Sequence, residues 1–235
     1  MTRLDDRVVL VTGANRGLGR EFVAQLTERG VAKIFAGARD PRSIDSRDPR
    51  VVALQLDVTD PESIRRAAGV ASDVSIVVNN AGISTPTSVL EPDTTKLRRE
   101  LEVNFLGPLA VTSAFIDGVV ERSGAVVNVA SVLAWLAVGQ SYSASKAALW
   151  SATEAMRLEL RPRGVQVLGV HMGYVDTDMT SGVDAPKASP RDVVSQVLDG
   201  LESGADEVLA DDLARAVRSQ LHLAFDSRYA PFLAS

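Results

Sequence analysis

The sequence lacks cysteine altogether, so a disulfide framework and a thiolate metal site are both excluded. It also lacks a surplus of positive charge: the formal net charge is −5, and the sequence has no cluster of Lys and Arg that would attract nucleic-acid backbones or anionic lipid. The first apolar run, residues 8–11, is too short for a signal segment or a membrane span. These absences predict a cytoplasmic protein with no metal, no nucleic-acid partner and no membrane partner.

Apolar residues are plentiful, at 46% of the chain, and they suffice for a sizeable core. Short runs rich in Val and Ile alternate with helical spacing. The expected strands are RVVLV, KIFAGA, RVVALQL, SIVVN, AVVNVAS, VQVLGVH and DEVLA, and the expected helices are 17–29, 61–71, 94–119, 141–161 and 189–203. Apolar runs without polar alternation suit strands covered on both faces, as in a parallel sheet.

This alternation predicts an α/β fold, a Rossmann-type doubly wound three-layer sandwich with a seven-stranded parallel sheet. No linker or repeat divides the chain, so we expect a single domain over residues 1–235, with a short loop at about 180–189 and a C-terminal helix and tail. Ligands of such a sheet bind beyond the carboxyl ends of its strands.

The first strand is followed by TGANRGLG, residues 12–19, which also opens a helix. Gly13, Gly17 and Gly19 would let the backbone turn sharply and let a diphosphate approach the free N–H groups of the helix N-terminus. The spacing is G-x-x-x-G-x-G rather than G-x-G-x-x-G, and a glycine triplet alone also fits a tight turn without a ligand.

Tyr142 and Lys146 lie four residues apart and therefore share one face of the expected helix 141–161. Taken alone, the pair also fits an exposed lysine stem covering a ring. Ser131 ends the fifth expected strand, where a hydroxyl often caps a helix. Asn104 lies within the long helix 94–119.

Together, TGANRGLG, NNAG at 79–82, Asn104, Ser131 and Tyr142-x-x-x-Lys146 resemble the short-chain dehydrogenase/reductase family over nearly the whole chain. The resemblance implies a nicotinamide cofactor and a small-molecule alcohol or carbonyl substrate. Reduction of a carbonyl requires a proton donor and a hydrogen-bond donor at its oxygen, roles that fall to Tyr142 and Ser131. The nearby ammonium of Lys146 is expected to lower the pKa of the phenol. By resemblance, Lys146 also bonds the nicotinamide ribose, and Asn104 holds a water that relays protons.

The same resemblance implies a set of cofactor contacts along the strand ends. They are Gly13, Asn15, Arg16, Gly17, Leu18, Gly19, Arg39, Asp57, Val58, Asn80, Ala81, Gly82, Tyr142, Lys146, Gly173, Val175 and Thr177. Arg16 and Arg39 suit a 2′-phosphate and favour NADP(H), whereas Asp40 would favour NAD(H) if it reached the ribose. The family usually has Pro-Gly where this chain has Met172-Gly173, so we expect a looser turn there.

The expected substrate walls, residues 132–140 and 83–89, are apolar and favour a hydrophobic ketone or aldehyde. Leu133 and Trp135 fit the core equally well. By resemblance, helices 94–119 and 141–161 pair between subunits to form a homodimer or homotetramer, with contributions from Phe105, Leu109, Trp150 and Met156. The sequence thus predicts an NADP(H)-dependent carbonyl reductase. The alternatives are a 3-oxoacyl reductase and a nicotinamide-binding sensor without turnover.

Overall fold

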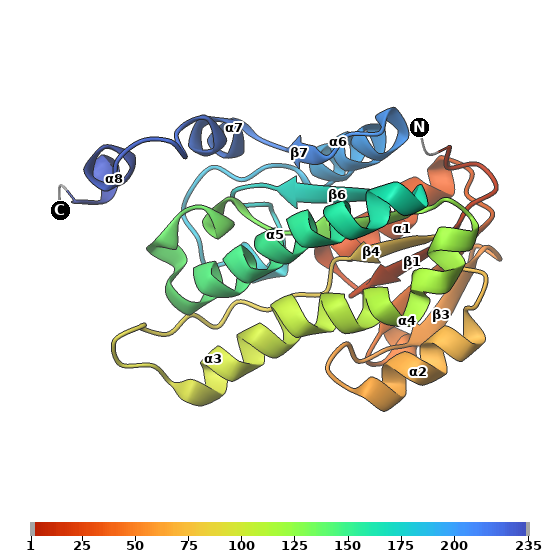
Figure 1. The fold of residues 1–235 in the computed structure, drawn as a ribbon. Helices are drawn as coiled ribbons and strands as arrows, with labels where there is room; N and C mark the ends of the chain where they lie inside the picture. The colour runs from red at the N-terminus through yellow and green to blue at the C-terminus, as the bar shows by residue number, and fades with distance from the viewer. Residues whose placement is uncertain (1–2, 234–235) are drawn as a thin grey trace.

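The computed structural model describes residues 3–233 and contains one parallel sheet with the strand order β3-β2-β1-β4-β5-β6-β7 (Figure 1). The strands are β1 (Val8–Thr12), β2 (Lys33–Ala38), β3 (Val51–Gln55), β4 (Ile76–Asn79), β5 (Ala125–Val129), β6 (Gln166–His171) and β7 (Glu207–Leu209). Every neighbouring pair is parallel. The predicted seven-stranded, doubly wound α/β sandwich is confirmed.

Helices cover both faces of this sheet (Figure 1). They are α1 (Gly17–Glu28), α2 (Pro61–Val70), α3 (Thr94–Leu101), α4 (Gly107–Glu121), α5 (Gln140–Leu160), α6 (Pro190–Ser203), α7 (Asp212–Ser219) and α8 (Phe225–Leu233). Val9 and Val11 of β1 pack in the core that α1 and α6 cover, whereas Leu10 faces the core beneath α2 and α4. Because successive side chains point to opposite faces, strands buried on both sides appear as continuous apolar runs.

The expected continuous helix 94–119 is instead interrupted by a π-helical turn, Glu102–Leu106. The N–H of Gly107 bonds to the carbonyl of Glu102, five residues back. Pro108 follows and has no N–H to donate to the carbonyl of Asn104, so the regular hydrogen-bond ladder cannot continue there. Asn104 therefore lies in a π turn and not in a regular α-helix.

The same stretch, residues 94–121, is the one helical segment of the described chain that is long and apolar enough to cross a membrane. Core helices of soluble proteins meet the same criterion, and 44% of its apolar window is buried inside this structure.

Candidate active site

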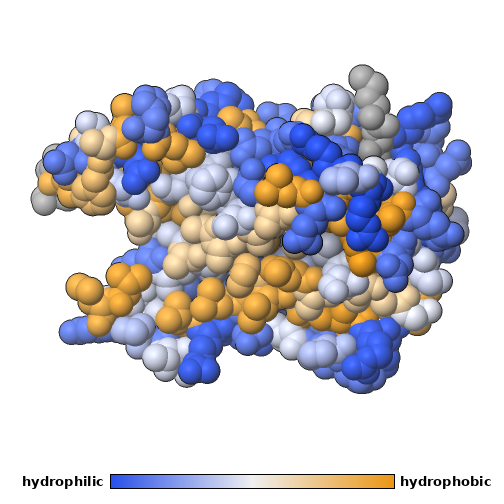
Figure 2. Space-filling model, in the orientation of Figure 1, coloured by the Kyte–Doolittle hydropathy of each residue, from blue (hydrophilic) through white to orange (hydrophobic). Residues whose placement is uncertain are grey.

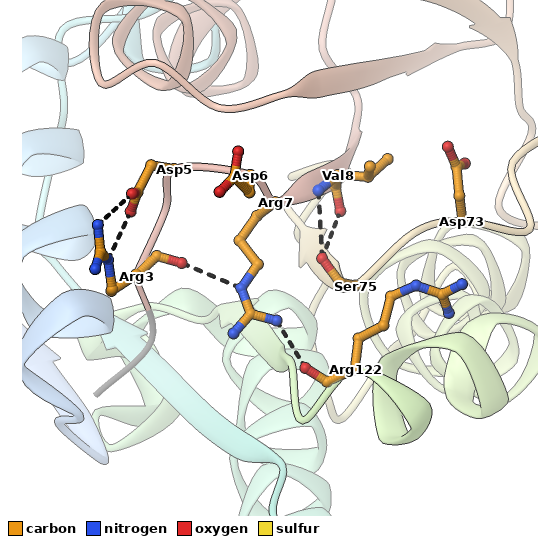
Figure 3. Close-up of a pocket in the computed structure, with 8 residues that line it drawn as sticks. All are labelled: Arg3, Asp5, Asp6, Arg7, Val8, Asp73, Ser75 and Arg122. Carbon is orange, nitrogen blue, oxygen red and sulfur yellow. Dashed lines mark hydrogen bonds and ion pairs between the residues drawn. The ribbon is translucent and has the colours of Figure 1, made fainter.

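A cleft of about 1000 Å³ runs along the carboxyl ends of the central strands. All the residues expected to contact the cofactor line it except Gly19, and Ser131 lines it too. A smaller cavity of about 520 Å³ lies near the amino end of β1 (Figure 3). Two of its arginines already have partners: Arg3 pairs with Asp5, and Arg7 donates to the backbone carbonyl of Arg122. The larger cleft is therefore the candidate site.

The glycine loop forms the floor of one end of the cleft. Gly13 and Gly17 have φ of 64° and 52°, a left-handed conformation that favours glycine. Gly19 lies behind the loop, where a Cβ would collide with the carbonyl oxygen of Gly13 and approach Asn80 Nδ2. The contact of Gly19 with the cofactor stays a prediction, and its missing side chain lets α1 approach the loop.

Asn80 braces this loop from the end of β4. Its Nδ2 donates to the carbonyls of Thr12 at 2.9 Å and Gly13 at 3.2 Å. The Thr12 hydroxyl accepts the N–H groups of Asn80 and Ala81, both at 3.0 Å. The amide of Asn80 is thus engaged in holding the loop, although the residue still borders the cleft.

Arg39 and Arg16 both border the cleft where β2 ends. Within residues 3–233, the exposed Arg39 makes no hydrogen bond or ion pair, whereas Arg16 lies 3.6 Å from a carboxylate oxygen of Asp178. Asp40 is held by Arg42 in a two-pronged contact of 2.9 and 3.0 Å, and these bonds lower the pKa of Asp40. Since Asp40 already has a guanidinium partner, the cationic character of this end is retained.

Asp57 follows β3 and accepts the N–H and hydroxyl of Thr59 at 2.9 and 2.8 Å. Burial opposes its charged form, but the hydrogen bonds from Thr59 and the charges of Arg99 and Arg39 outweigh it and lower the pKa of Asp57. The following helix, α2, is capped by Asp60. Asp57 is therefore not the cap of this helix.

Tyr142, Lys146 and Ser131 meet at the inner part of the cleft. Tyr142 and Lys146 lie on the first turns of α5, and Ser131 follows β5. The Lys146 Nζ lies 5.9 Å from the Tyr142 ring centroid and donates to the carbonyl of Val129 at 2.8 Å. Lys146 is only 4% exposed, and burial lowers the pKa of its ammonium to about 8. The exposed-pair interpretation of Tyr142 and Lys146 therefore does not hold.

Burial raises the pKa of Tyr142 above its ordinary value of 10.0. A side-chain hydrogen bond with Ser131 acts in the opposite direction, and the negative charge of Glu100 adds to the increase. The prediction that Lys146 makes this phenol acidic is wrong in this structure. The physical reason is that burial of the phenol disfavours phenolate, while the ammonium points its hydrogen bond at a backbone carbonyl.

Asn104 is fully buried and does not border the cleft. Its Oδ1 accepts the N–H of Ile83 at 2.9 Å, and its Nδ2 donates to the Ile83 carbonyl at 2.9 Å and to Ser145 Oγ at 3.0 Å. The side chain thus joins the π turn, the strand end after β4 and helix α5. In the structure, the hydrogen bonds of Asn104 hold these three segments together.

The turn at Met172-Gly173 is held more firmly than the sequence predicts. The N–H of Gly173 donates to Asp211 Oδ2 at 2.6 Å, and Asp211 Oδ1 accepts the N–H of Ala214 at 2.7 Å as the cap of α7. The expectation of a loose turn is corrected, because this carboxylate replaces the missing proline constraint. Two aspartates before a helix predict a helix cap from the sequence alone. The hydrogen bond from Gly173 to Asp211, in contrast, is a tertiary contact that the local sequence does not predict.

The other part of the cleft has apolar walls from four segments. They comprise Leu133, Leu136 and Val138 after β5, Ile83 and Pro86 after β4, Met179 and Val183 near the 180–189 loop, and Phe232 of α8. Figure 2 shows a notch open between α8 and the loop before α3. Trp135 is not a wall: it is buried and stacks on His171 at 3.9 Å. Phe232 was not expected here, because nothing local to its sequence places α8 at the cleft.

The sequence pattern of the short chain dehydrogenases matches residues 7–188. The chain belongs to the short-chain dehydrogenase family. It is similar to a short chain dehydrogenase from Burkholderia cenocepacia solved in complex with NADP, with 39% identity, full coverage of both chains and a TM-score of 0.94. It is also similar to an NADPH-bound carbonyl reductase from chicken fatty liver, with 28% identity, coverage of 86% and 94%, and a TM-score of 0.79. A 3-oxoacyl-[acyl-carrier-protein] reductase of Vibrio cholerae is 33% identical over 77% of this chain and 78% of the relative.

Proposed function

We propose that this short-chain dehydrogenase uses NADP(H) to interconvert an apolar ketone or aldehyde and the corresponding alcohol, with Tyr142 as the acid and base. The observation that carries the proposal is the convergence of Ser131, Tyr142 and Lys146 in one cleft with the glycine loop. A sensor that only binds a nicotinamide has no need of a hydroxyl pair beside a buried ammonium.

The residues of the cleft fit such a cofactor. The glycine loop borders the cleft at the N-terminus of α1, where free backbone N–H groups favour a diphosphate. Arg39 and Arg16 supply guanidinium groups suited to a 2′-phosphate, and two similar structures carry NADP or NADPH. When bound, the cofactor supplies or accepts the hydride.

The chain's own residues handle the proton and the developing charge. Tyr142 donates its hydroxyl proton to the carbonyl oxygen, and Ser131 donates a second hydrogen bond to it. Lys146, with a pKa of about 8, is mostly cationic at neutral pH, and its ammonium lies 5.9 Å from the centroid of the Tyr142 ring. We propose that Asn104 supports this arrangement by fixing Ile83 and Ser145.

Tyr142→Phe tests this function. We expect kcat for an apolar ketone to fall by about 100- to 10,000-fold, the usual contribution of a positioned acid. The affinity for NADPH, measured by fluorescence titration, should change little because the ring remains. Full turnover in the variant, with NADPH still bound, would contradict the proposal.

A 3-oxoacyl reductase is a second candidate, supported by the similarity to the Vibrio cholerae enzyme. Such an enzyme would need basic groups where an acidic carrier docks, whereas Val138, Met179 and Phe232 border the outer cleft. Comparing kcat/KM for a carrier-linked 3-oxoacyl group with that for a free apolar ketone separates the two. We expect the free ketone to be the better substrate.

A further inference from the structure

The outer cleft is the part of the cavity that is bordered by four partly exposed apolar side chains. They are Val138 after β5, Met179 after β6, Leu213 of α7 and Phe232 of α8, with exposed fractions of 45%, 49%, 48% and 47%. All four border the same cavity as Tyr142. Single exposed apolar residues are ordinary on a protein surface, whereas a group of them around one cavity indicates a binding surface.

Hydrogen bonds fix one wall of the outer cleft to the helix of Tyr142. Ser143 follows Tyr142 on α5 and is buried. Its hydroxyl donates to the carbonyl of Leu136 at 2.6 Å and accepts the N–H of Gly139 at 3.0 Å. Val138 lies in the turn between these two partners, so this wall is held in place relative to the proposed proton donor.

Helix α8 is attached to the same turn through one side chain. Tyr229 is 8% exposed and is the buried residue of α8. Its hydroxyl accepts the N–H of Ala137 at 3.0 Å, and its ring packs in an apolar cluster with Leu136 and Val217. Phe232 lies on the same helix, and its ring centroid is 6.3 Å from that of Tyr229. The anchored Tyr229 therefore holds Phe232 at the cleft.

The four side chains of the outer cleft offer no charge to a ligand. Asp178 precedes Met179, but its carboxylate lies 3.6 Å from a guanidinium nitrogen of Arg16 at the glycine loop. A charged group among the four apolar side chains would lose hydration without gaining an ion pair from them. An alkyl or aryl group would instead remove apolar surface from water, which is favourable.

We propose that the outer cleft binds the apolar tail of an extended ketone or aldehyde whose carbonyl group lies at Tyr142, and that Phe232 makes this binding depend on the length of the tail. This inference rests on the proposed function and deepens it by naming a class of substrate. Because hydrogen bonds already hold the walls, little ordering is needed when the tail binds.

Binding of methyl ketones to the protein loaded with NADP⁺ tests the outer cleft without turnover. The ketone stays unreacted because NADP⁺ has no hydride to give, and calorimetric titration measures its Kd. Methyl ethyl, methyl pentyl and methyl octyl ketone form the series. We expect Kd to fall by about 2- to 4-fold for each methylene group that enters the outer cleft. A Kd that does not depend on tail length overturns the inference.

Phe232→Ala tests the contact at the end of the tail. We expect Kd for methyl octyl ketone to rise by about 5- to 20-fold, because the tail loses an apolar partner. Methyl ethyl ketone is too short to reach α8, so its Kd should change by less than about 2-fold. Phe232→Leu keeps an apolar side chain and should restore most of the affinity for the long ketone. Equal changes for the long and the short ketone overturn the role of Phe232.

Phe225→Ala is the matched control. Phe225 lies on the same helix, is 60% exposed and does not border the cleft. Its truncation should leave Kd unchanged for every ketone in the series. A loss of affinity for methyl octyl ketone equal to that in Phe232→Ala would show that the helix as a whole matters and would overturn the assignment to Phe232.

A second copy of the chain is another occupant that could cover an apolar surface. It would compete with the tail, so Kd for methyl octyl ketone would rise with protein concentration. We expect the same Kd over a tenfold range of protein concentration, and a clear rise overturns the inference.

The two proposals fail in different ways. Turnover retained in Tyr142→Phe removes the proposed function, even where Kd still depends on tail length. An inactive Tyr142→Phe combined with a Kd that is independent of tail length removes only the role of the outer cleft.

Discussion

Arg39 and Arg16 differ in whether their guanidinium groups already have an ion-pair partner. Arg16 lies 3.6 Å from Asp178, whereas Arg39 makes no ion pair within residues 3–233 and faces the end of the cleft beyond β2. The neighbouring Asp40, which could have reached a ribose, is bound by Arg42. Of these residues, Arg39 is therefore best placed to distinguish a 2′-phosphate from a 2′-hydroxyl.

We predict that Arg39→Ala raises KM for NADPH by about 10- to 100-fold, the loss of a hydrogen bond between charged groups. KM for NADH should change far less, because no phosphate is lost. Steady-state kinetics with both cofactors measures the ratio. Arg47→Ala is the matched control, since Arg47 is 90% exposed, pairs with Asp45 and lies outside the cleft. Equal losses for the two cofactors in Arg39→Ala would contradict the prediction.

At the scale of elements, one carboxylate hydrogen-bonds both to α7 and to the turn after β6. Asp211 accepts the N–H groups of both Gly173 and Ala214. It thus caps α7 and holds a turn that borders the cleft, so that a C-terminal helix fixes part of the candidate site.

We predict that Asp211→Ala lowers the free energy of unfolding by about 1 to 3 kcal/mol, because a helix cap is lost and the Gly173 N–H loses its acceptor. Urea denaturation measures this change. The neighbouring Asp212→Ala provides the comparison: Asp212 is fully exposed and pairs with Arg215 on its own helix, so its effect should stay within about 0.5 kcal/mol. Equal effects of the two variants would show that the Gly173 contact contributes nothing.

At the scale of the whole molecule, the surface over α4 and the neighbouring part of α5 carries an apolar band (Figure 2). Leu158 of α5 is 79% exposed, and Leu106 beside α4 is 44% exposed. Because the two apolar cores, one on each face, pack against the same sheet, we propose that the chain is one domain. We also propose that it pairs through this α4–α5 face into a homodimer or a homotetramer.

We predict that Leu158→Arg shifts the protein toward a monomer, because a charge placed in an apolar interface loses hydration without gaining a partner. Light scattering at several concentrations measures the mass. Val70 lies at the end of α2 and is 66% exposed. Val70→Arg makes the same chemical change outside the proposed interface and should leave the mass unchanged. A monomeric unmodified protein would rule out the interface altogether.

The sequence by itself determined the sheet and most of the cleft. Alternation of apolar runs with helical spacing is a local property, and so is the glycine pattern after β1. Apart from the π turn that interrupts the expected helix 94–119, strands and helices therefore fell at their expected places, and the strand ends brought Gly13, Asn80, Ser131 and Tyr142 to one edge of the sheet.

Tertiary structure decided the features that depend on partners distant in the chain. The pairing of Asp211 with Gly173 and the burial of Glu100 beside the helix of Tyr142 join segments 38 and 41 residues apart. Even the direction of the pKa shift of Tyr142 depends on how deeply the phenol is buried. Local spacing shows which residues share a helix face, but desolvation and charge depend on everything that surrounds a group in three dimensions.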